Sequence, residues 1–286
     1  MGDAIALAES SRKHYRAVGL ALAASILWSS GGLLIKWVSW NPLAISGARS
    51  AIAAVVLLLA LRRIRFSWSF AQVGGAVVYA ATVMLFVAAT KLTTSANAIL
   101  LQYTAPVYAA LFGAWFLGER VSWLDGATIA VVIGGMVLFF FDRLTPGGML
   151  GNALAIASGV TYAGLVTFLR KQKDASPLES ILMGNILTAL LGLPFMLQGA
   201  PGGASWIGLI LLGVFQLGLS YVLYSSAIKH ITVLEAILVS VIEPILNPVW
   251  VYLAMGEAPG RWALAGGTIV LIGMAARYAL SALRKT

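Results

Sequence analysis

"TTSANAILLQYTAPVYAALFGAWFLGERVSW", residues Thr93 to Trp123, is apolar for long enough to cross a membrane, yet Pro106 stands near its middle. A proline has no backbone N–H, so the carbonyl four residues earlier, on Gln102, loses its helical partner. In hydrocarbon such a carbonyl must face protein, ligand or water. The stretch therefore predicts a membrane helix that is interrupted at depth.

A weaker copy of this stretch occurs later in the chain. "ATKLTTSANAIL" begins at Ala89 and "AIKHITVLEAIL" begins at Ala227, 138 positions later. At the same offset the copies share Pro106 with Pro244, Gly118 with Gly256, and Glu119 with Glu257. Self-similarity of this kind predicts two related halves.

Three prolines are predicted hinges: Pro106, Pro244 and, one turn later, Pro248. Pro244 frees the carbonyl of Ser240, and Pro248 frees that of Pro244. The alternative interpretation is a packing kink, in which a neighbouring helix satisfies the freed carbonyl.

The composition of the chain indicates whether it lies in water or in a lipid bilayer. Of the 286 residues, 60% are apolar and 10% are charged, and the mean hydropathy is +0.92. A water-soluble domain does not sustain these values, so the chain is predicted to be an integral membrane protein. The net charge of +9 does not indicate nucleic acid, because the cations cluster between apolar runs. Without cysteine, and with two distant histidines, the chain offers no metal motif; we expect no enzymatic activity, no catalytic residues, no metal and no cofactor.

Apolar runs of membrane-spanning length predict the topology. Ten are found, at 17–38, 42–61, 71–90, 97–117, 124–141, 150–169, 178–197, 205–228, 235–254 and 262–282. The predicted segments are a cytoplasmic N-terminal segment (1–16), a first five-helix repeat (17–141), a second repeat (150–282) and a cytoplasmic C-terminal tail (283–286). Because each repeat crosses the membrane an odd number of times, the second repeat enters the membrane from the opposite side. We expect an all-α membrane protein of ten transmembrane helices, built as two inverted five-helix repeats around a central cavity.

The distribution of Lys and Arg predicts the orientation. With both termini cytoplasmic, only Lys36, Lys91, Arg143 and Arg261 fall near the outer side. The cytoplasmic segments then hold Arg12, Lys13, Arg16, Arg62, Arg63, Arg65, Arg120, Arg170, Lys171, Lys173, Lys229, Arg277, Arg284 and Lys285. This bias follows the positive-inside rule.

Inverted repeats with interrupted helices are typical of transporters. Two similar halves can exchange conformations about a site near the midplane, which gives inward-open and outward-open states of comparable energy. The sequence therefore predicts transport by alternating access.

The chain resembles the drug/metabolite transporter superfamily, in particular its ten-helix EamA-type exporters, including aromatic amino-acid exporters. The resemblance is carried by "TTSANAILLQYTAPVYAALFGAWFLGERVSWLDGATIAVVIGGMVL", Thr93 to Leu138, and by its twin from Thr232 to Met274. It implies a carrier in the bacterial inner membrane that exports amino acids or other small metabolites, with a cavity lined by helices other than the fifth and tenth. The second half departs from the first at Glu243 and Asn247, where the first half has Ala105 and Ala109.

Polar and aromatic residues at helical spacing mark the faces that we expect to line this cavity. The predicted substrate-binding residues are Trp28, Tyr79, Thr82, Phe86, Gln102, Tyr103, Tyr162, Gln216, Ser220, Tyr221, Tyr224, Ser240, Glu243 and Asn247. Each aromatic has packing as its alternative role. Glu243 is predicted to bind an ammonium group or to accept a proton, with a structural hydrogen bond as the alternative. Arg49 is either a partner of a carboxylate or carbonyl, or a contact for anionic substrate groups.

These features predict a secondary transporter that exports small organic metabolites, amino acids with aromatic or hydrophobic side chains among them. The alternative is an exporter of drug-like aromatic cations. The expected partners are the small-molecule substrate and membrane lipid, without nucleic acid. Gly126, Ala130, Gly134, Gly266 and Gly273 let us predict close packing between spans 124–141 and 262–282. We expect a monomer, with contact between two copies as the alternative.

Overall fold

The chain is a multi-pass bundle in which every described element is helical. The computed structural model describes residues 2–61, 64, 66–118, 122–138, 141, 146–175, 177–240 and 242–283. The first half contains α1 (Gly2–Ser29), α2 (Gly31–Trp37), α3 (Pro42–Ala60), α4 (Phe70–Leu92), α5 (Ser95–Gln102), α6 (Ala105–Leu117) and α7 (Trp123–Leu138). The second contains α8 (Pro146–Lys171), α9 (Pro177–Met196), α10 (Gly203–Leu211), the π-helix η1 (Leu212–Leu219), α11 (Ser220–Ala227), α12 (Val233–Val239), α13 (Ile242–Met255) and α14 (Arg261–Leu283).

Eight helical segments of the described chain are long and apolar enough to cross a membrane. They correspond to eight of the predicted spans. The other two predicted spans, 124–141 and 262–282, correspond to α7 and α14, which are not among the eight. Residues 139 and 140 of the former, Glu119 of the repeat and residues 284–286 of the predicted tail lie outside the described residues. The predicted N-terminal segment 1–16 continues into the first span, because α1 begins at Gly2.

The two interrupted helices break where the prolines predict. α5 ends at Gln102 and α6 begins at Ala105, and α12 ends at Val239 before α13 begins at Ile242. Each break precedes its proline because the unpaired group is the carbonyl one turn earlier. Pro106 and Pro244 lie in the first turn of α6 and α13, where a missing N–H removes no intrahelical bond. Pro248 lies inside α13 without ending it.

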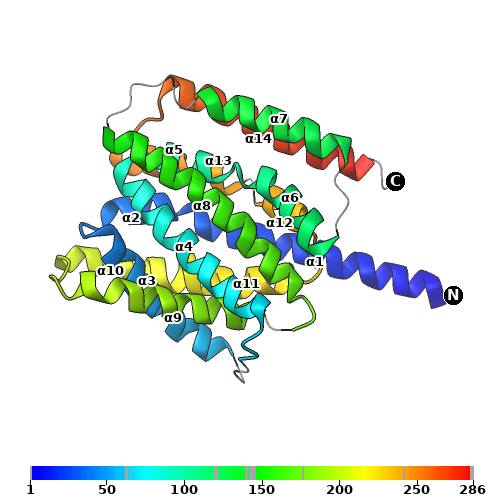
Figure 1. Cartoon of the computed structure of the whole chain (residues 1–286), viewed down its shortest axis with the longest axis horizontal. Helices are drawn as coiled ribbons and strands as arrows, with labels where there is room; N and C mark the ends of the chain where they lie inside the picture. Colours follow the sequence, from blue (N-terminus) through cyan, green and yellow to red (C-terminus); the bar gives the residue numbers. More distant parts are fainter. Residues whose placement is uncertain are drawn as a thin grey trace.

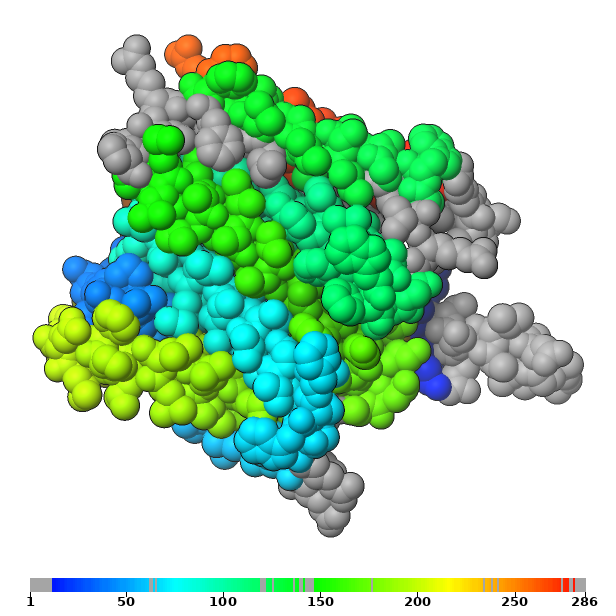
Figure 2. Space-filling view, viewed as in Figure 1, coloured from blue at the N-terminus to red at the C-terminus, as the bar shows by residue number. Residues whose placement is uncertain are grey.

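Helices of the two halves pack against each other throughout the bundle. α3 packs on α9, α4 on α8, α1 on α11, α6 on α12 and α7 on α14 (Figure 1). Glycines allow the closest of these approaches: a Cβ added at Gly47 would lie 2.9 Å from the Cα of Gly192, so α3 and α9 meet backbone to backbone. Figure 2 shows the face on which α4, α8 and α9 lie side by side.

The predicted contact between spans 124–141 and 262–282 is confirmed, with a correction to its glycines. α7 and α14 lie side by side at the edge of the bundle (Figure 1). On α14, Gly273 faces Val131, as predicted, but on α7 the contact glycine is Gly135, whose added Cβ would lie 2.8 Å from the Gly266 carbonyl oxygen. Gly126 and Gly134 have no described atom within 4 Å of a Cβ position, because they lie on the opposite face of α7.

Candidate substrate-binding site

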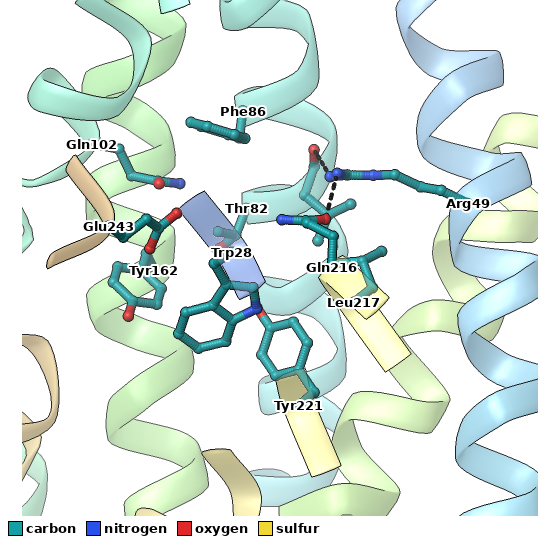
Figure 3. Close-up of a pocket in the computed structure, with 11 residues that line it drawn as sticks. Trp28, Arg49, Thr82, Phe86, Gln102, Tyr162, Gln216, Leu217, Tyr221 and Glu243 are labelled. Atoms are coloured by element: carbon teal, nitrogen blue, oxygen red, sulfur yellow. Dashed lines mark hydrogen bonds between the residues drawn. The ribbon is translucent and has the colours of Figure 1, made fainter. Parts of the chain in front are cut away.

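A small cavity lies at the junction of the two halves (Figure 3). Its walls are formed by Trp28, Arg49, Thr82, Val83, Phe86, Gln102, Tyr162, Gln216, Leu217, Tyr221 and Glu243. Its volume of about 40 Å³ suits a few water molecules, whereas sites for organic ligands occupy about 300–1,000 Å³. The protein is therefore closed around this cavity, and an organic solute needs a more open arrangement of the same walls.

Arg49 brings a buried guanidinium to one wall. It lies in α3, with 1% of its side chain exposed. Its Nη1 donates to Gln216 Oε1 at 3.1 Å and its Nη2 to the Val83 carbonyl at 3.5 Å (Figure 3). Its Nε has no hydrogen-bond partner among the described residues. A buried cation held by neutral acceptors, with its Nε–H unused, is suited to receive an anionic group.

Two local features of the backbone place Gln216 against this guanidinium. Gln216 lies in η1, where the π-helix inserts an extra residue into the turn and changes the direction of the side chains that follow; such insertions are frequent at functional sites. Position 31 at the start of α2 is glycine, and a Cβ there would lie 3.0 Å from Gln216 Nε2. A larger residue at position 31 would push the amide away from Arg49.

Glu243 brings a carboxyl group to the opposite side of the cavity (Figure 3). It lies in the first turn of α13, with 7% of the side chain exposed. The Tyr103 hydroxyl lies 2.8 Å from its Oε2 and 2.7 Å from the Ser240 carbonyl. This is the carbonyl that loses its regular helical donor to Pro244, and it accepts instead from the Glu243 N–H at 3.0 Å and from Tyr103, as membrane burial requires.

Aromatic rings packed at tilted and edge-on angles build the wall between these two groups. The Trp28 ring lies 5.0 Å from that of Tyr221 and 4.9 Å from that of Tyr224, and Tyr79 packs on Tyr221 at 5.1 Å. Trp28 Nε1 has no acceptor among the described residues. The wall therefore offers apolar ring faces and the unused indole N–H of Trp28.

Neutral polar groups complete the site near Gln102. Its Nε2 donates to Ser158 Oγ at 2.7 Å, and Ser158 Oγ donates to the Thr82 carbonyl at 3.1 Å. The Thr82 hydroxyl lies 2.9 Å from that of Thr161. These bonds tie α4, α5 and α8 together behind the cavity and hold the Gln102 amide at its wall.

The cavity brings together eight of the predicted site residues: Trp28, Thr82, Phe86, Gln102, Tyr162, Gln216, Tyr221 and Glu243. The other six do not line it: Tyr79, Tyr103, Ser220, Tyr224, Ser240 and Asn247. Tyr79, Tyr103 and Tyr224 pack behind residues that do. Ser220 Oγ donates to the carbonyl of Gln216 on its own helix, as Ser240 Oγ does to that of Ala236. Asn247 accepts from Ser95 Oγ at 2.6 Å, away from the cavity.

Two wall residues, Val83 and Leu217, were not predicted, because an apolar side chain in a membrane helix carries no signal that separates a cavity wall from packing. Arg49, for which two roles stayed open, is a wall residue. Its isolated charge in span 42–61 was the signal that identified it.

A polar cluster ties the two halves together at one end of the bundle. Lys36 Nζ lies 2.9 Å from Glu257 Oε2 and donates to the Thr93 carbonyl at 2.9 Å. Glu257 Oε1 accepts from the Ser95 N–H at 2.7 Å. Lys91 Nζ donates to the Val38 carbonyl at 2.6 Å. Both lysines therefore bind protein groups at this end, and Lys36 joins the first half to the second.

Comparison with known proteins gives the same two halves. The sequence profile of the EamA-like transporter family matches the chain twice, over residues 15–141 and 149–277. A solved structure has the same fold, with a TM-score of 0.73 at 22% identity over 94% of this chain and 98% of that chain.

Relatives with assigned names are similar over much of the chain. An uncharacterized transporter of Archaeoglobus fulgidus is 33% identical over 68% of this chain and 70% of its own length. The aromatic amino acid exporter YddG of Ancylobacter novellus is 26% identical over 70% of this chain and 72% of that exporter. A probable terminal-alkyne amino-acid exporter of Streptantibioticus cattleyicolor is 26% identical, and the match spans 62% of each of the two chains.

Proposed function

Because the chain belongs to the EamA-like transporter family, we propose that it exports amino acids with aromatic or hydrophobic side chains, and related small metabolites, by alternating access. The observation that carries this proposal is the position of Arg49 and Glu243 on opposite sides of one cavity between the two halves. Two of the named relatives are amino-acid exporters, which supports the substrate class.

The chemistry of the walls matches the parts of such a substrate. Arg49 offers a guanidinium, with Nε unused, for the α-carboxylate. Glu243 offers a carboxylate, when ionised, for the α-ammonium. The rings of Trp28, Tyr162 and Tyr221 suit an aromatic or large apolar side chain, and they also attract cations at their faces.

The proposed topology is ten transmembrane helices in two inverted repeats, within the bacterial inner membrane and with both termini cytoplasmic. The start of α1 and the end of α14 lie at the same end of the bundle, which supports an even number of crossings (Figure 1). Lysines related by the repeat also make related bonds: Lys91 donates to the Val38 carbonyl, and Lys229, 138 positions later, donates to that of Ala175. Equivalent bonds in each half are expected of a duplicated unit. A monomer is sufficient for this arrangement.

Export of aromatic cations is the second candidate, favoured by Glu243 and the surrounding rings. A cation of this kind has no group for Arg49, and its charge is repelled by the guanidinium in the same cavity. The amino-acid proposal uses both charged groups, whereas the cation proposal uses one.

The test is uptake into liposomes that contain the purified protein. We expect saturable transport of labelled L-phenylalanine, competition by L-tryptophan and L-leucine, and little competition by phenethylamine, which keeps the ring and the ammonium but lacks the carboxylate. Protein-free liposomes provide the control. Stronger competition by phenethylamine than by tryptophan would favour the cation exporter, and uptake that does not saturate would contradict a carrier.

A further inference from the structure

Glu243, Tyr103 and the Ser240 carbonyl form a chain of three oxygen atoms joined by two short contacts. When Glu243 is ionised, the chain has only one proton for these two contacts. The Tyr103 hydroxyl lies 2.7 Å from the carbonyl and 2.8 Å from Glu243 Oε2, but a phenol carries one proton. An ionised Glu243 and a carbonyl are both acceptors only. If Tyr103 donates to one of them, the other contact joins two oxygens without a proton between them.

A proton on Glu243 supplies the second hydrogen-bond donor that these contacts need. The carboxylic acid then donates to Tyr103 Oη, and Tyr103 donates to the Ser240 carbonyl. Each of the two short contacts then contains one hydrogen. The carbonyl also accepts from the Glu243 N–H at 3.0 Å, and it has room for the phenol as a second donor because Pro244 removes its usual helical donor.

The surroundings of Glu243 also favour the neutral acid in this closed arrangement. The ionisable groups that face it are Tyr103, Tyr162 of α8, Tyr221 and Tyr224 of α11, and Arg49 across the cavity. None of the described cations is within ion-pairing distance of its carboxyl group, and the guanidinium of Arg49 donates to Gln216 and to the Val83 carbonyl. An unpaired carboxylate at 7% exposure in a membrane protein is costly.

We propose that Glu243 is the proton-binding site of the carrier: the closed, substrate-free protein holds a proton there, and substrate binding releases it. This inference rests on the proposed transport function. Phenols and guanidinium groups titrate far from neutral pH, so Glu243 is the group in this set that exchanges a proton under cellular conditions.

The exchange balances in charge and atoms. Before binding, the site holds the Arg49 cation and neutral Glu243. On binding, the O–H bond of Glu243 breaks, its proton passes to water, and the substrate's ammonium, which already carries its own protons, pairs with the new carboxylate. The substrate's carboxylate pairs with Arg49. One proton thus enters the cell for each zwitterion that leaves, and an inward proton gradient drives export.

The first experiment detects the proton without measuring transport. Infrared spectra of purified protein in nanodiscs should contain a carboxylic-acid C=O band at neutral pH that is absent from Glu243→Gln and that disappears when L-phenylalanine is added. Glu235→Gln removes a carboxyl from the same broken helix, where it faces His14, and should keep the band. Tyr103→Phe should shift the band, because the acid loses its phenol partner.

The second experiment measures coupling in proteoliposomes. For one-to-one exchange, with the membrane potential held at zero by potassium and valinomycin, a gradient of one pH unit should sustain about a tenfold gradient of labelled phenylalanine for the wild type and for Glu235→Gln. Glu243→Gln should lose this response.

The outcomes separate the two proposals. If the band is absent from the substrate-free wild type, or if wild-type accumulation of phenylalanine ignores the pH gradient, proton binding at Glu243 is overturned. If phenylalanine is not transported but the Glu243 band is present, the proposed substrate is wrong and the proton site stands.

Discussion

Arg49 and Glu243 give the cavity its two ends, and each is held by neighbours that are themselves fixed. Gln216 and the Val83 carbonyl hold the guanidinium, and Tyr103 holds the carboxyl group. Trp28 lies between these ends and keeps an unused indole N–H. A buried ionisable group kept in place by neutral partners is what a site needs if the substrate is to supply the missing charge.

Trp28→Ala should weaken transport of aromatic substrates more than that of small aliphatic ones. The indole packs on Tyr221 and Tyr224, and losing such a buried ring costs about 2 kcal/mol, or about 30-fold in apparent affinity for phenylalanine. The measurement is the concentration dependence of uptake for phenylalanine and alanine. Trp115→Ala, at an exposed site on α6, is the matched control. Equal losses for both substrates would mean that Trp28 has a packing role only.

At the residue scale, sequence spacing predicted which helix faces point toward the cavity. It did not predict which side chains on those faces reach the cavity. Trp28, Gln216 and Glu243 were predicted and line the cavity. Tyr224 lies on the predicted face, but it is one layer further out, because Trp28 covers it. Helical periodicity fixes the direction of a side chain, whereas the neighbour that covers it comes from another part of the chain.

At the scale of elements, the chain has two broken helices, α5 with α6 and α12 with α13. Each break places helix ends inside the bundle. The prolines predicted these breaks because each removes a definite N–H. The break between α1 and α2 and the π-helix η1 were not predicted. At the break between α1 and α2, Ser30 Oγ donates back to the Leu27 carbonyl. Neither such a serine nor the extra residue of a π-helix changes the hydrophobic pattern of the sequence, so neither feature could be predicted from it.

Pro244→Ala should slow transport by returning an N–H to α13. The Ser240 carbonyl, which now accepts from the Glu243 N–H and from Tyr103, can then accept the regular helical bond, which changes the balance between the broken and the continuous helix. One hydrogen bond is worth about 1 kcal/mol, so we expect a loss on the order of 5- to 10-fold in rate. Pro194→Ala, at an exposed site in α9, controls for loss of a membrane proline. Rates for Pro244→Ala equal to those of the wild type would remove its hinge role.

At the scale of the whole molecule, each half repeats the other's contacts across a shared interface. By the 138-residue offset, the contact of α4 with α8 corresponds to that of α1 with α11, and α3 with α9 is a contact between counterpart helices. The internal repeat predicted two related halves, and the family profile matches each of them. The sequence could not predict which conformation is the stable one, because the closing contacts join residues far apart in the chain.

Equivalent loops of the two halves should label from opposite sides of the membrane. Ile64, between α3 and α4, and Gly202, before α10, are exposed and are related by the repeat offset. The chain contains no cysteine, so Ile64→Cys and Gly202→Cys each report one site. In intact cells an impermeant maleimide should react with Gly202→Cys alone, and both should react after the membrane is opened. Labelling of both in intact cells would contradict the inverted arrangement.

The ion pair between Lys36 and Glu257 should act as a latch that closes one end of the carrier. Its side chains are 19% and 27% exposed, so the pair is worth about 1 kcal/mol, and reversal of one charge costs more because like charges then meet. Lys36→Glu and Glu257→Lys should each reduce transport several-fold, and the double variant should recover part of it, because the charges attract again but the bonds to the Thr93 carbonyl and the Ser95 N–H are not restored. Surface expression of all four proteins is the control. A double variant as impaired as the worse single variant would show that the two charges do not act as a pair.

The most direct test of the account is counterflow of phenylalanine, because it requires both a substrate site and its alternating exposure. Liposomes that contain the protein and a high internal concentration of unlabelled L-phenylalanine are diluted into a trace of labelled L-phenylalanine. The wild type and Arg261→Met, which removes an exposed cation at the start of α14, should accumulate label transiently above its equilibrium level. Arg49→Met, which removes the proposed carboxylate partner, should abolish the overshoot. An overshoot in Arg49→Met equal to that of the wild type, or none in the wild type, would contradict transport of an amino acid between Arg49 and Glu243.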